Sequence, residues 1–316
     1  MKKIYYITAV FATLFLVGCG DGIDLPGVNV ETDLNKIPLP DNNVNLEQVE
    51  LKPSTEPMLH EGLHTEEDFQ RIRDKKAAGE EPWVSAYQLL VESQFSQKTA
   101  DTYPTEWIKR GVSGDENYMN AARGATIVYQ QALRWKIEQD DEYAAKAVEN
   151  LNKWVQTCVG VTGNTNLSLA AGLYGYEFAI AGELLRDYGG WDRADFAAFQ
   201  NWLLKVFYPA NDDFLKRHHD TNALHYWANW CLCNIAAKMA IGIVTDRRDI
   251  YNEGIAHLQT GDTNGRLRRA IYHDYAPDYN FAQWQESGRD QGHTLMCVGL
   301  MGVICQLAWS QGDDFF

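Results

Sequence analysis

The sequence is poor in cysteine, in proline and in basic residues. It has 6 cysteines and 9 prolines among 316 residues, which argues against a dense disulfide scaffold and against collagen-like or proline-rich architectures. Its 28 basic residues are outnumbered by 43 acidic ones, which leaves a formal net charge of −15. Because general nucleic-acid binding requires a basic surface, we expect no nucleic-acid partner.

The few cysteines show no spacing typical of a metal or redox site. Cys158, Cys231, Cys233, Cys297 and Cys305 lie among apolar residues, where cysteine behaves as a small hydrophobic side chain. Cys231 and Cys233 are separated by one residue, unlike the usual zinc or redox motifs. We therefore predict no disulfide framework, no zinc–cysteine site and no cofactor. A metal held by the group His218, His219, Asp220 and His225 stays open as an alternative.

Long apolar runs are also missing beyond the N-terminus. Lys2 and Lys3 precede an apolar stretch at 4–17, and Leu-Val-Gly-Cys at 16–19 resembles a bacterial lipobox. We expect residues 1–18 to be a lipoprotein signal peptide and Cys19 to carry the lipid that anchors the chain to a membrane. The expected location is the periplasm or the outer-membrane surface of a Gram-negative bacterium. An ordinary secretory signal is the alternative.

The remaining chain reads as a tether followed by one helical domain. Residues 19–58 are rich in Asp, Asn, Pro and Gly, which indicates a flexible tether. Thr65 with the acids after it is typical of a helix start, and Pro82 opens a second helix. Apolar periodicity predicts further helices at about 117–139, 141–158, 166–188, 192–207, 222–243, 247–259 and 289–311.

These helices, with no convincing strand between them, predict an all-α fold. We expect an (α/α) toroid, or an incomplete barrel of antiparallel helical hairpins, over residues 59–316. Several helices are apolar on most faces and should be buried on most faces. The last one, ending near Trp309, is followed by only a few residues, so we expect the domain to be truncated at its C-terminus.

Three segments concentrate polar and aromatic residues beyond what a core requires: 160–166, 216–230 and 266–293. The chain has no Gly-x-Ser-x-Gly, no glycine-rich phosphate loop and no His-Glu-x-x-His. Serine-hydrolase, P-loop nucleotide-binding and zinc-peptidase chemistry are therefore not indicated. The basic residues Lys216, Arg217, Arg266, Arg268 and Arg269 lie in two of these segments, and we expect a basic cleft despite the acidic total.

Within these segments, His-Tyr-Trp-Ala-Asn-Trp at 225–230, Tyr-His at 272–273 and Glu-Ser-Gly-Arg-Asp-Gln-Gly-His at 286–293 resemble the alginate-lyase-type polysaccharide lyases. The resemblance extends from Leu59 to the end and includes Gly-Leu-His-Thr at 62–65 and Gly-Asn-Thr-Asn at 163–166. It implies an α/α toroid that cleaves a uronic-acid polymer. Better-known members carry Asn-Asn-His-x-Tyr-Trp where this chain has Asn-Ala-Leu-His-Tyr-Trp at 222–227. This difference suggests a relative such as polysaccharide lyase family 38, with alginate or glucuronan as substrate.

The residue types fit β-elimination independently. A polyuronate lyase removes the C5 proton beside a charged carboxylate, so its site needs groups that neutralise that carboxylate, a base and an acid. Tyrosine can serve as both acid and base on one face, or histidine as base with tyrosine as acid on opposite faces. We assign catalysis to His225, Tyr272, Arg266 and Asn166. Substrate binding is assigned to Asn164, Asn222, Tyr226, Trp227, Arg268, Arg269, His273, Trp284, Glu286, Arg289 and His293.

Other interpretations of the same residues stay open. Asn164 and Asn166 could cap the helix that begins near Leu167, and Glu286 could pair with Arg289 as a brace. An inverting glycoside hydrolase would need two carboxylates, such as Asp220 and Glu286. A glycan-binding lipoprotein without activity would use Trp227, Trp230 and Trp284 as a platform.

Overall fold

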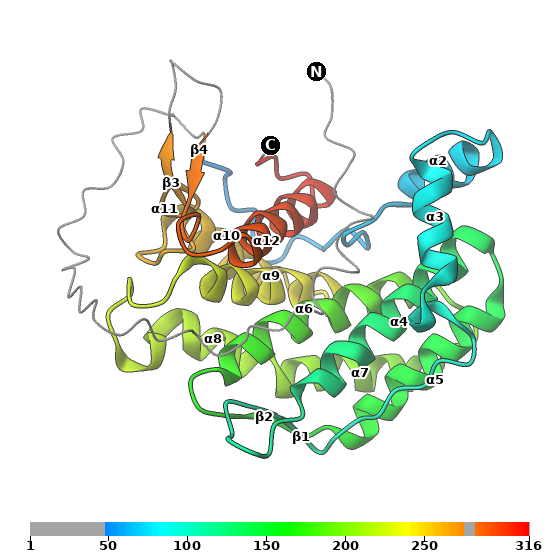
Figure 1. Cartoon of the computed structure of the whole chain (residues 1–316), viewed down its shortest axis with the longest axis horizontal. Coiled ribbons are helices and arrows are strands. Elements are labelled where there is room, and N and C mark those ends of the chain that lie inside the picture. The colour runs from blue at the N-terminus through cyan, green and yellow to red at the C-terminus, as the bar shows by residue number, and fades with distance from the viewer. Residues whose placement is uncertain (1–47, 275–281, 316) are drawn as a thin grey trace.

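The computed structural model describes residues 48–274 and 282–315, so the expected signal peptide and Cys19 lie outside the described residues. Helices dominate this part of the chain, with a few short strands between them (Figure 1). In chain order the elements are α2 (Glu66–Ala77), α3 (Trp83–Glu92), η2 (Gln94–Ser96), β1 (Trp107–Arg110), α4 (Tyr118–Glu138), α5 (Asp141–Thr157), β2 (Gly160–Gly163), α6 (Leu167–Leu185), α7 (Arg193–Val206), α8 (Tyr208–Arg217), η3 (His218–Asp220), α9 (Ala228–Val244), α10 (Arg248–Thr260), α11 (Leu267–Ala270), β3 (Ile271–Asp274), β4 (Ala282–Trp284) and α12 (Gln291–Ser310).

Four of these helices form an inner layer. α6 packs between α4 and α9, and α12 packs on the far side of α9. The helices that alternate with them along the chain, α5, α7, α8 and α10, lie outside this layer (Figure 1). This is the predicted all-α toroid built from helical hairpins, and the prediction of fold class is confirmed.

The inner helices run in the same direction. Near their starts, the Asn234 side chain of α9 donates to the Ser168 carbonyl of α6 at 3.2 Å. Near their ends, Arg186 donates to the Val244 carbonyl at 2.8 Å. Strands β1 and β2 lead into α4 and α6 and pair in parallel. All inner helices therefore begin at one end of the molecule.

A small residue permits the close contact between α6 and α9. A Cβ at Gly172 would lie 2.5 Å from the Cys233 sulfur and 2.9 Å from its carbonyl carbon. Real Cβ atoms do not approach other atoms so closely, and the core beside this point is fully packed. Any larger residue at position 172 would therefore push the two central helices apart.

Two predicted helix starts are confirmed. Thr65 caps α2, since its hydroxyl accepts from the Asp68 amide at 3.1 Å and the Asp68 carboxylate accepts from the Thr65 amide at 3.0 Å. This is a capping box that satisfies donors left free at the helix start. Pro82 directly precedes α3.

Two helix predictions were wrong between residues 208 and 227. α8 was not predicted, and the helix expected at 222–243 begins only at Ala228. The Asn222 side chain accepts from the Leu224 amide at 2.8 Å, and the His225 amide donates to the Asn222 carbonyl at 2.9 Å. These bonds close a turn in place of the first helical turns, so His225 lies in a loop.

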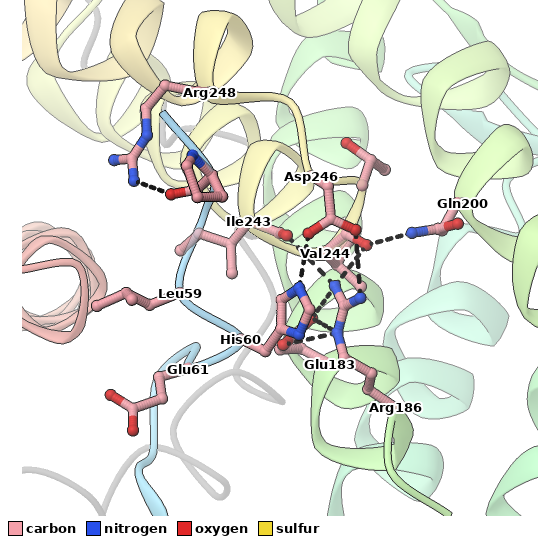
Figure 2. Close-up of polar contacts among 12 residues, drawn as sticks. Leu59, His60, Glu61, Glu183, Arg186, Gln200, Ile243, Val244, Asp246 and Arg248 are labelled. Carbon is pink, nitrogen blue, oxygen red and sulfur yellow. Dashed lines mark hydrogen bonds and ion pairs between the residues drawn. The ribbon is translucent and has the colours of Figure 1, made fainter. Parts of the chain in front are cut away.

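The last part of the expected tether is docked onto the domain. We call residues 48–64 the N-terminal strap. The Lys52 ammonium pairs with Asp313 at 3.1 Å, and the Asn252 side chain donates to the Lys52 carbonyl at 2.7 Å. His60 pairs with Asp246 at 2.9 Å, and Asp246 also pairs with Arg186 (Figure 2). Polar groups of α10 and of the residues after α12 therefore contact the part of the expected tether that the structure describes, while the boundary at residue 58 stays a prediction.

The remaining sequence expectations concern cysteine, strands and membrane segments. Cys158, Cys231, Cys233, Cys297 and Cys305 are buried and take part in no disulfide within the described residues. Contrary to prediction, short strands do occur, as the pairs β1–β2 and β3–β4. Of the helices in the described part of the chain, α12 alone is long and apolar enough to cross a membrane, and half of it is buried in the fold. A core helix meets the same criterion.

Candidate functional site

The predicted site residues gather at the end where the inner helices begin. Asn164 and Asn166 precede α6, residues 222–227 precede α9, and residues 266–290 precede α12, with His293 in its first turn. In Figure 1 the pair β1–β2 lies at the bottom of the molecule and the pair β3–β4 lies at its upper left. Helix N-termini present free amide donors and a partial positive charge. The site is thus assembled where the backbone itself favours an anion.

Asn164 orients Asn166 before α6. The Asn164 side-chain oxygen accepts from the Asn166 amide at 2.9 Å and from the Asn166 side chain at 3.0 Å. Asn166 occupies the N-cap position without a side-chain capping bond, whereas the Asn164 side chain satisfies the Asn166 amide at the helix start, as a capping residue does. Gly111 faces Asn164 with φ +77°, and a Cβ there would overlap the Asn164 side chain. The glycine therefore leaves room for the asparagine.

Arg110 at the end of β1 was not predicted. It is 6% exposed, and its Nη1 is buried without a hydrogen-bond partner. It pairs with Gly163 in the parallel register, next to Asn164. Its guanidinium lies over the Tyr118 ring at 4.7 Å from the centroid. Within residues 48–274 and 282–315 we find no carboxylate partner for it, although a buried charge is usually paired.

Of the three residues 225–227 directly before α9, the first and the last have exposed side chains and the middle one is buried. His225 is exposed, and Trp227 is 45% exposed at the N-cap of α9. Tyr226 is only 8% exposed and packs on Phe214 and Trp230. Its ring therefore packs in the core, and the assignment of Tyr226 to substrate binding stays a prediction.

Asn222 and His219 position this segment. Asn222 was assigned to substrate binding, but its side-chain oxygen closes the turn described above. His219 contacts the Ser168 hydroxyl of α6 at 3.0 Å and packs edge-on against Tyr226. His218, His219 and Asp220 all have positive φ, which is costly for residues with a side chain. The loop that carries His225 is therefore held by specific contacts rather than by helix.

Tyr272 lies at a β-bulge. In the antiparallel pair β3–β4, Ile271 faces Trp284 and His273 faces Gln283, so Tyr272 is the extra residue. Bulges redirect side chains and are frequent beside active sites. Tyr272 is 41% exposed and His273 is exposed, whereas Trp284 is half-buried against the core. The Asn264 and Gln285 side chains connect this hairpin to the His225 segment.

The two predicted basic groups differ in their pairing. Lys216 pairs with Asp212 at 2.8 Å, and Arg217 pairs with Asp213 and Asp220. In the described chain Arg266, Arg268 and Arg269 have no carboxylate partner within ion-pair distance. Arg269 donates to the Asp262 carbonyl, and burial and the nearby Arg266 charge lower its pKa. The positive charge of the site therefore comes from residues 266–269, and the part expected from Lys216 and Arg217 is neutralised.

Glu286, Arg289 and His293 form a brace at the start of α12. The Glu286 side chain is 1% exposed and pairs with Arg289 at 2.7 Å. Asp290 caps α12 through the His293 amide at 2.8 Å and contacts the His293 ring at 2.6 Å. The hydrogen bond from the His293 amide, together with the His293 side chain, lowers the pKa of Asp290. The carboxylate of Glu286 is buried and paired, as the alternative interpretation of a brace with Arg289 expects, and its assignment to substrate binding stays a prediction.

The histidines proposed as metal ligands face different partners. The His218 Nε2 lies 3.9 Å from the Cys231 sulfur, while the His219 Nε2 contacts Ser168. In the part of the chain that the structure describes, no three His, Cys, Asp or Glu side chains lie together so that they could hold a metal ion.

A cavity of about 210 Å³ lies at the opposite end of the inner helices. His60, His64, Lys136 and Glu183 are among the residues that line it, and no predicted site residue does.

Sequence reasoning missed Arg110, Asn264 and Gln285 as parts of the site. In the sequence Arg110 is a single arginine before a glycine, and this pattern does not distinguish a buried site residue from an ordinary charged surface residue.

Three comparisons place the chain among known proteins. A family model described as alginate lyase matches residues 72–316. The comparison with curated proteins finds no match. Alginate lyase A1-III from Sphingomonas species A1 has a TM-score of 0.54 at 13% identity, covering 81% of this chain and 73% of that chain. An alginate lyase from Bacteroides ovatus has a TM-score of 0.54 at 14% identity, covering 81% and 78%. An A1-III variant complexed with a tetrasaccharide has a TM-score of 0.56 at 13% identity, covering 82% and 73%.

Proposed function

Because this chain belongs to the alginate lyase family, whose activity is that of a polysaccharide lyase, we propose that it cleaves a uronic-acid polymer by β-elimination. Alginate is the first candidate substrate and glucuronan the second. The observation that carries this proposal is the arginine group at 266–269, which has no carboxylate partner in the described chain and lies directly before Tyr272. Guanidinium groups bind carboxylates in a two-point geometry, and a uronic acid supplies one carboxylate per sugar.

The proposed reaction breaks two bonds and forms one double bond. A base removes the proton from C5, and Arg266 and Asn166 bind the adjacent carboxylate while negative charge develops on it. The bond between C4 and the glycosidic oxygen then breaks, and an acid protonates that oxygen. The products are a sugar with a double bond between C4 and C5 and a chain with a new hydroxyl group.

Tyr272 and His225 are the proposed acid–base groups. Both side chains are exposed at the end where the inner helices begin, and backbone segments linked by Asn264 and Gln285 carry them. Tyr272 would act as the acid, with either His225 or its own phenolate as the base. A neighbouring guanidinium stabilises a phenolate, and Arg266 lies six residues before Tyr272.

Additional substrate contacts are proposed around this centre. Arg268, Arg269 and Arg110 would bind further carboxylates, and Asn164 and His273 would donate or accept hydrogen bonds. The exposed faces of Trp227 and Trp107 would stack on sugar rings. Trp284 is half-buried, so only the edge of its ring would contact a sugar.

The hydrolase alternative is weaker on this geometry. Its two carboxylates would be Asp220 and Glu286, but Asp220 pairs with Arg217 and the buried Glu286 pairs with Arg289. A carboxylate held in a buried ion pair is poorly placed to transfer a proton to substrate. A glycan-binding protein without activity could use the same arginines but would need no acid–base groups such as Tyr272 and His225.

Incubation of the purified full chain with alginate, glucuronan and a neutral glycan tests the proposal. A lyase produces the conjugated double bond, seen as new ultraviolet absorbance, only from the polyuronates. New reducing ends without absorbance would indicate a hydrolase, and binding without either would indicate a glycan-binding protein. Failure to generate the absorbance from any polyuronate would refute the proposal.

The lipoprotein assignment also stays a proposal. Cys19 would receive a lipid on its sulfur and become the first residue once the signal peptide is cleaved, and residues 20–47 would separate the membrane from the docked strap. The enzyme would then meet its polymer in the periplasm or at the outer-membrane surface.

A further inference from the structure

Two buried side-chain amides join the segment that carries His225 to the hairpin that carries Tyr272. Gln285 and Asn264 are 7% and 8% exposed, and neither was assigned a role from sequence. The Gln285 Nε2 donates to the Asn264 Oδ1 at 3.0 Å. The two amides therefore act as one unit, which we call the amide clamp.

One end of the clamp holds the His225 segment on both sides of the histidine. The Asn264 Nδ2 donates to the Leu224 carbonyl at 3.0 Å and to the Tyr226 carbonyl at 2.9 Å. The Gln285 Oε1 accepts from the amide of Ala228, the first residue of α9, at 3.1 Å. Within the described chain, residues 224–228 have no strand partner and their other backbone hydrogen bonds are local turn bonds. These three bonds therefore hold the backbone of the segment in addition to the packing of the Tyr226 ring.

The other end holds the arginine group and the bulge. The Gln285 Nε2 donates to the Arg269 carbonyl at 2.8 Å, and the Gln285 amide donates to the Ala270 carbonyl at 3.0 Å. Ala270 is two residues before Tyr272. The same glutamine side chain thus contacts the backbone of the arginine group and the backbone at the start of α9.

We propose that Asn264 and Gln285 are positioning residues that set the relative placement of His225 and Tyr272 for the elimination. This inference rests on the proposed function. Proton abstraction and leaving-group protonation require both groups at fixed places on one sugar, and a displacement of about 1 Å can reduce turnover a hundredfold. The polar atoms of the clamp are used within the protein, so its loss should affect kcat more than KM.

Gln285→Glu tests the clamp with minimal change in shape. The carboxylate retains the acceptor for the Ala228 amide but cannot donate to the Asn264 oxygen or the Arg269 carbonyl. We expect kcat to fall at least tenfold at the upper end of the active pH range, with KM within threefold of wild type. The loss should diminish at lower pH, because a protonated carboxyl group restores one donor.

The chain supplies a matched control far from the site. Gln131 is fully buried, donates to the carbonyls of Gln97 and Ala100 at 2.9 and 3.1 Å, and accepts from Asn150 at 3.1 Å. Gln131→Glu should therefore destabilise the fold in the same way without affecting kcat below its melting temperature. Equal kcat losses in both variants would overturn the proposal, as would a wild-type kcat for Gln285→Glu across the whole pH range.

Hydrogen exchange supplies a readout that does not depend on activity. In Gln285→Glu, the amides of 222–228 and 270–274 should exchange faster than in wild type, while in Gln131→Glu they should not. If Gln285→Glu does not fold, Asn264→Asp removes the donors to residues 224 and 226, with Asn150→Asp as its control and the same criteria. Unchanged exchange in these segments would refute the clamp. A wild-type chain inactive on every polyuronate would refute the proposed function instead.

Discussion

The guanidinium of Arg110 lies 4.7 Å from the centroid of the Tyr118 ring, and it has no carboxylate partner in the described part of the chain. A cation–π contact of this kind is worth about 0.5–2 kcal/mol, which is less than the cost of burying an unpaired charge. The position next to Asn164 supports the proposal that a substrate carboxylate pairs with Arg110.

Replacement of Arg110 by methionine should weaken substrate binding while leaving the fold stable. A hydrogen bond to a charged group contributes about 1.5–3 kcal/mol, so we expect KM for a polyuronate to rise about 10- to 100-fold. The melting temperature should not fall much, since a buried unpaired charge is removed. Arg217→Met is the control, because Arg217 already pairs with Asp213 and Asp220. An unchanged KM for Arg110→Met would exclude this arginine from the site.

Tyr272→Phe should abolish turnover and preserve binding. The change removes only the hydroxyl group of an exposed side chain, and general acid–base catalysis typically contributes 10²- to 10⁴-fold. We expect kcat to fall at least a hundredfold, with oligouronate affinity, measured by calorimetry, within about threefold of wild type. Tyr103→Phe, at a more exposed tyrosine, should behave as wild type. Substantial remaining turnover would show that Tyr272 is not the acid.

Glu177 in the middle of α6 should make stability depend on pH. Its Oε2 is buried without a hydrogen-bond partner, and burial raises its pKa from 4.5 to about 8. Between these values the folded state binds more protons than the unfolded state, so the free energy of unfolding falls as pH rises. Glu177→Gln removes this effect. The free energy of unfolding of Glu177→Gln minus that of wild type should therefore rise by roughly 1–3 kcal/mol between pH 5 and pH 8. Denaturant unfolding at both pH values measures this difference.

Glu149 provides the control for this pH effect. Hydrogen bonds from Lys153 and Lys146 lower its pKa. The contribution of Glu149 to the free energy of unfolding is therefore complete above pH 5 and is lost only at lower pH. The difference between Glu149→Gln and wild type should stay constant from pH 5 to pH 8. A constant difference for Glu177→Gln as well would show that Glu177 ionises normally in the folded protein.

The proposed lipid anchor depends on a single atom, the sulfur of Cys19. Cys19→Ala should move the protein from the membrane fraction to the soluble fraction of the exported material, because the acceptor for the lipid is lost. Fractionation followed by mass spectrometry of the N-terminal peptide measures both changes. A wild-type N-terminal peptide that carries no lipid on Cys19 would refute the anchor.

Local patterns were sufficient for most of the helices. Thr65 and Asp68 form the capping box of α2, and apolar periodicity located most inner and outer helices within a few residues. Prediction failed where a side chain competes with the helix for backbone groups, as Asn222 does before α9. It also failed for α8, although the pairs Asp212–Lys216 and Asp213–Arg217 have the i, i+4 spacing of a helix.

The candidate site was predicted in its segments but not in its individual roles. A hydrophobic pattern could not predict which of the residues 225–227 is buried, because these residues form neither a strand nor a helix. The core takes Tyr226 and leaves His225 and Trp227 exposed. For Glu286 the sequence left two roles open, substrate binding and a brace with Arg289, and the structure shows the pair with Arg289 at 2.7 Å.

By itself, the sequence determined the helical content, the order of the hairpins and the segments that carry His225 and Tyr272, because these depend on residues near one another in the chain. Only the tertiary structure decided which charges remain available. Lys216 and Arg217 are neutralised by aspartates, while Arg110 and the arginine group at 266–269 find no acid in the described chain. Pairing depends on distances across the fold, and so does the amide clamp, whose two members come from segments 21 residues apart.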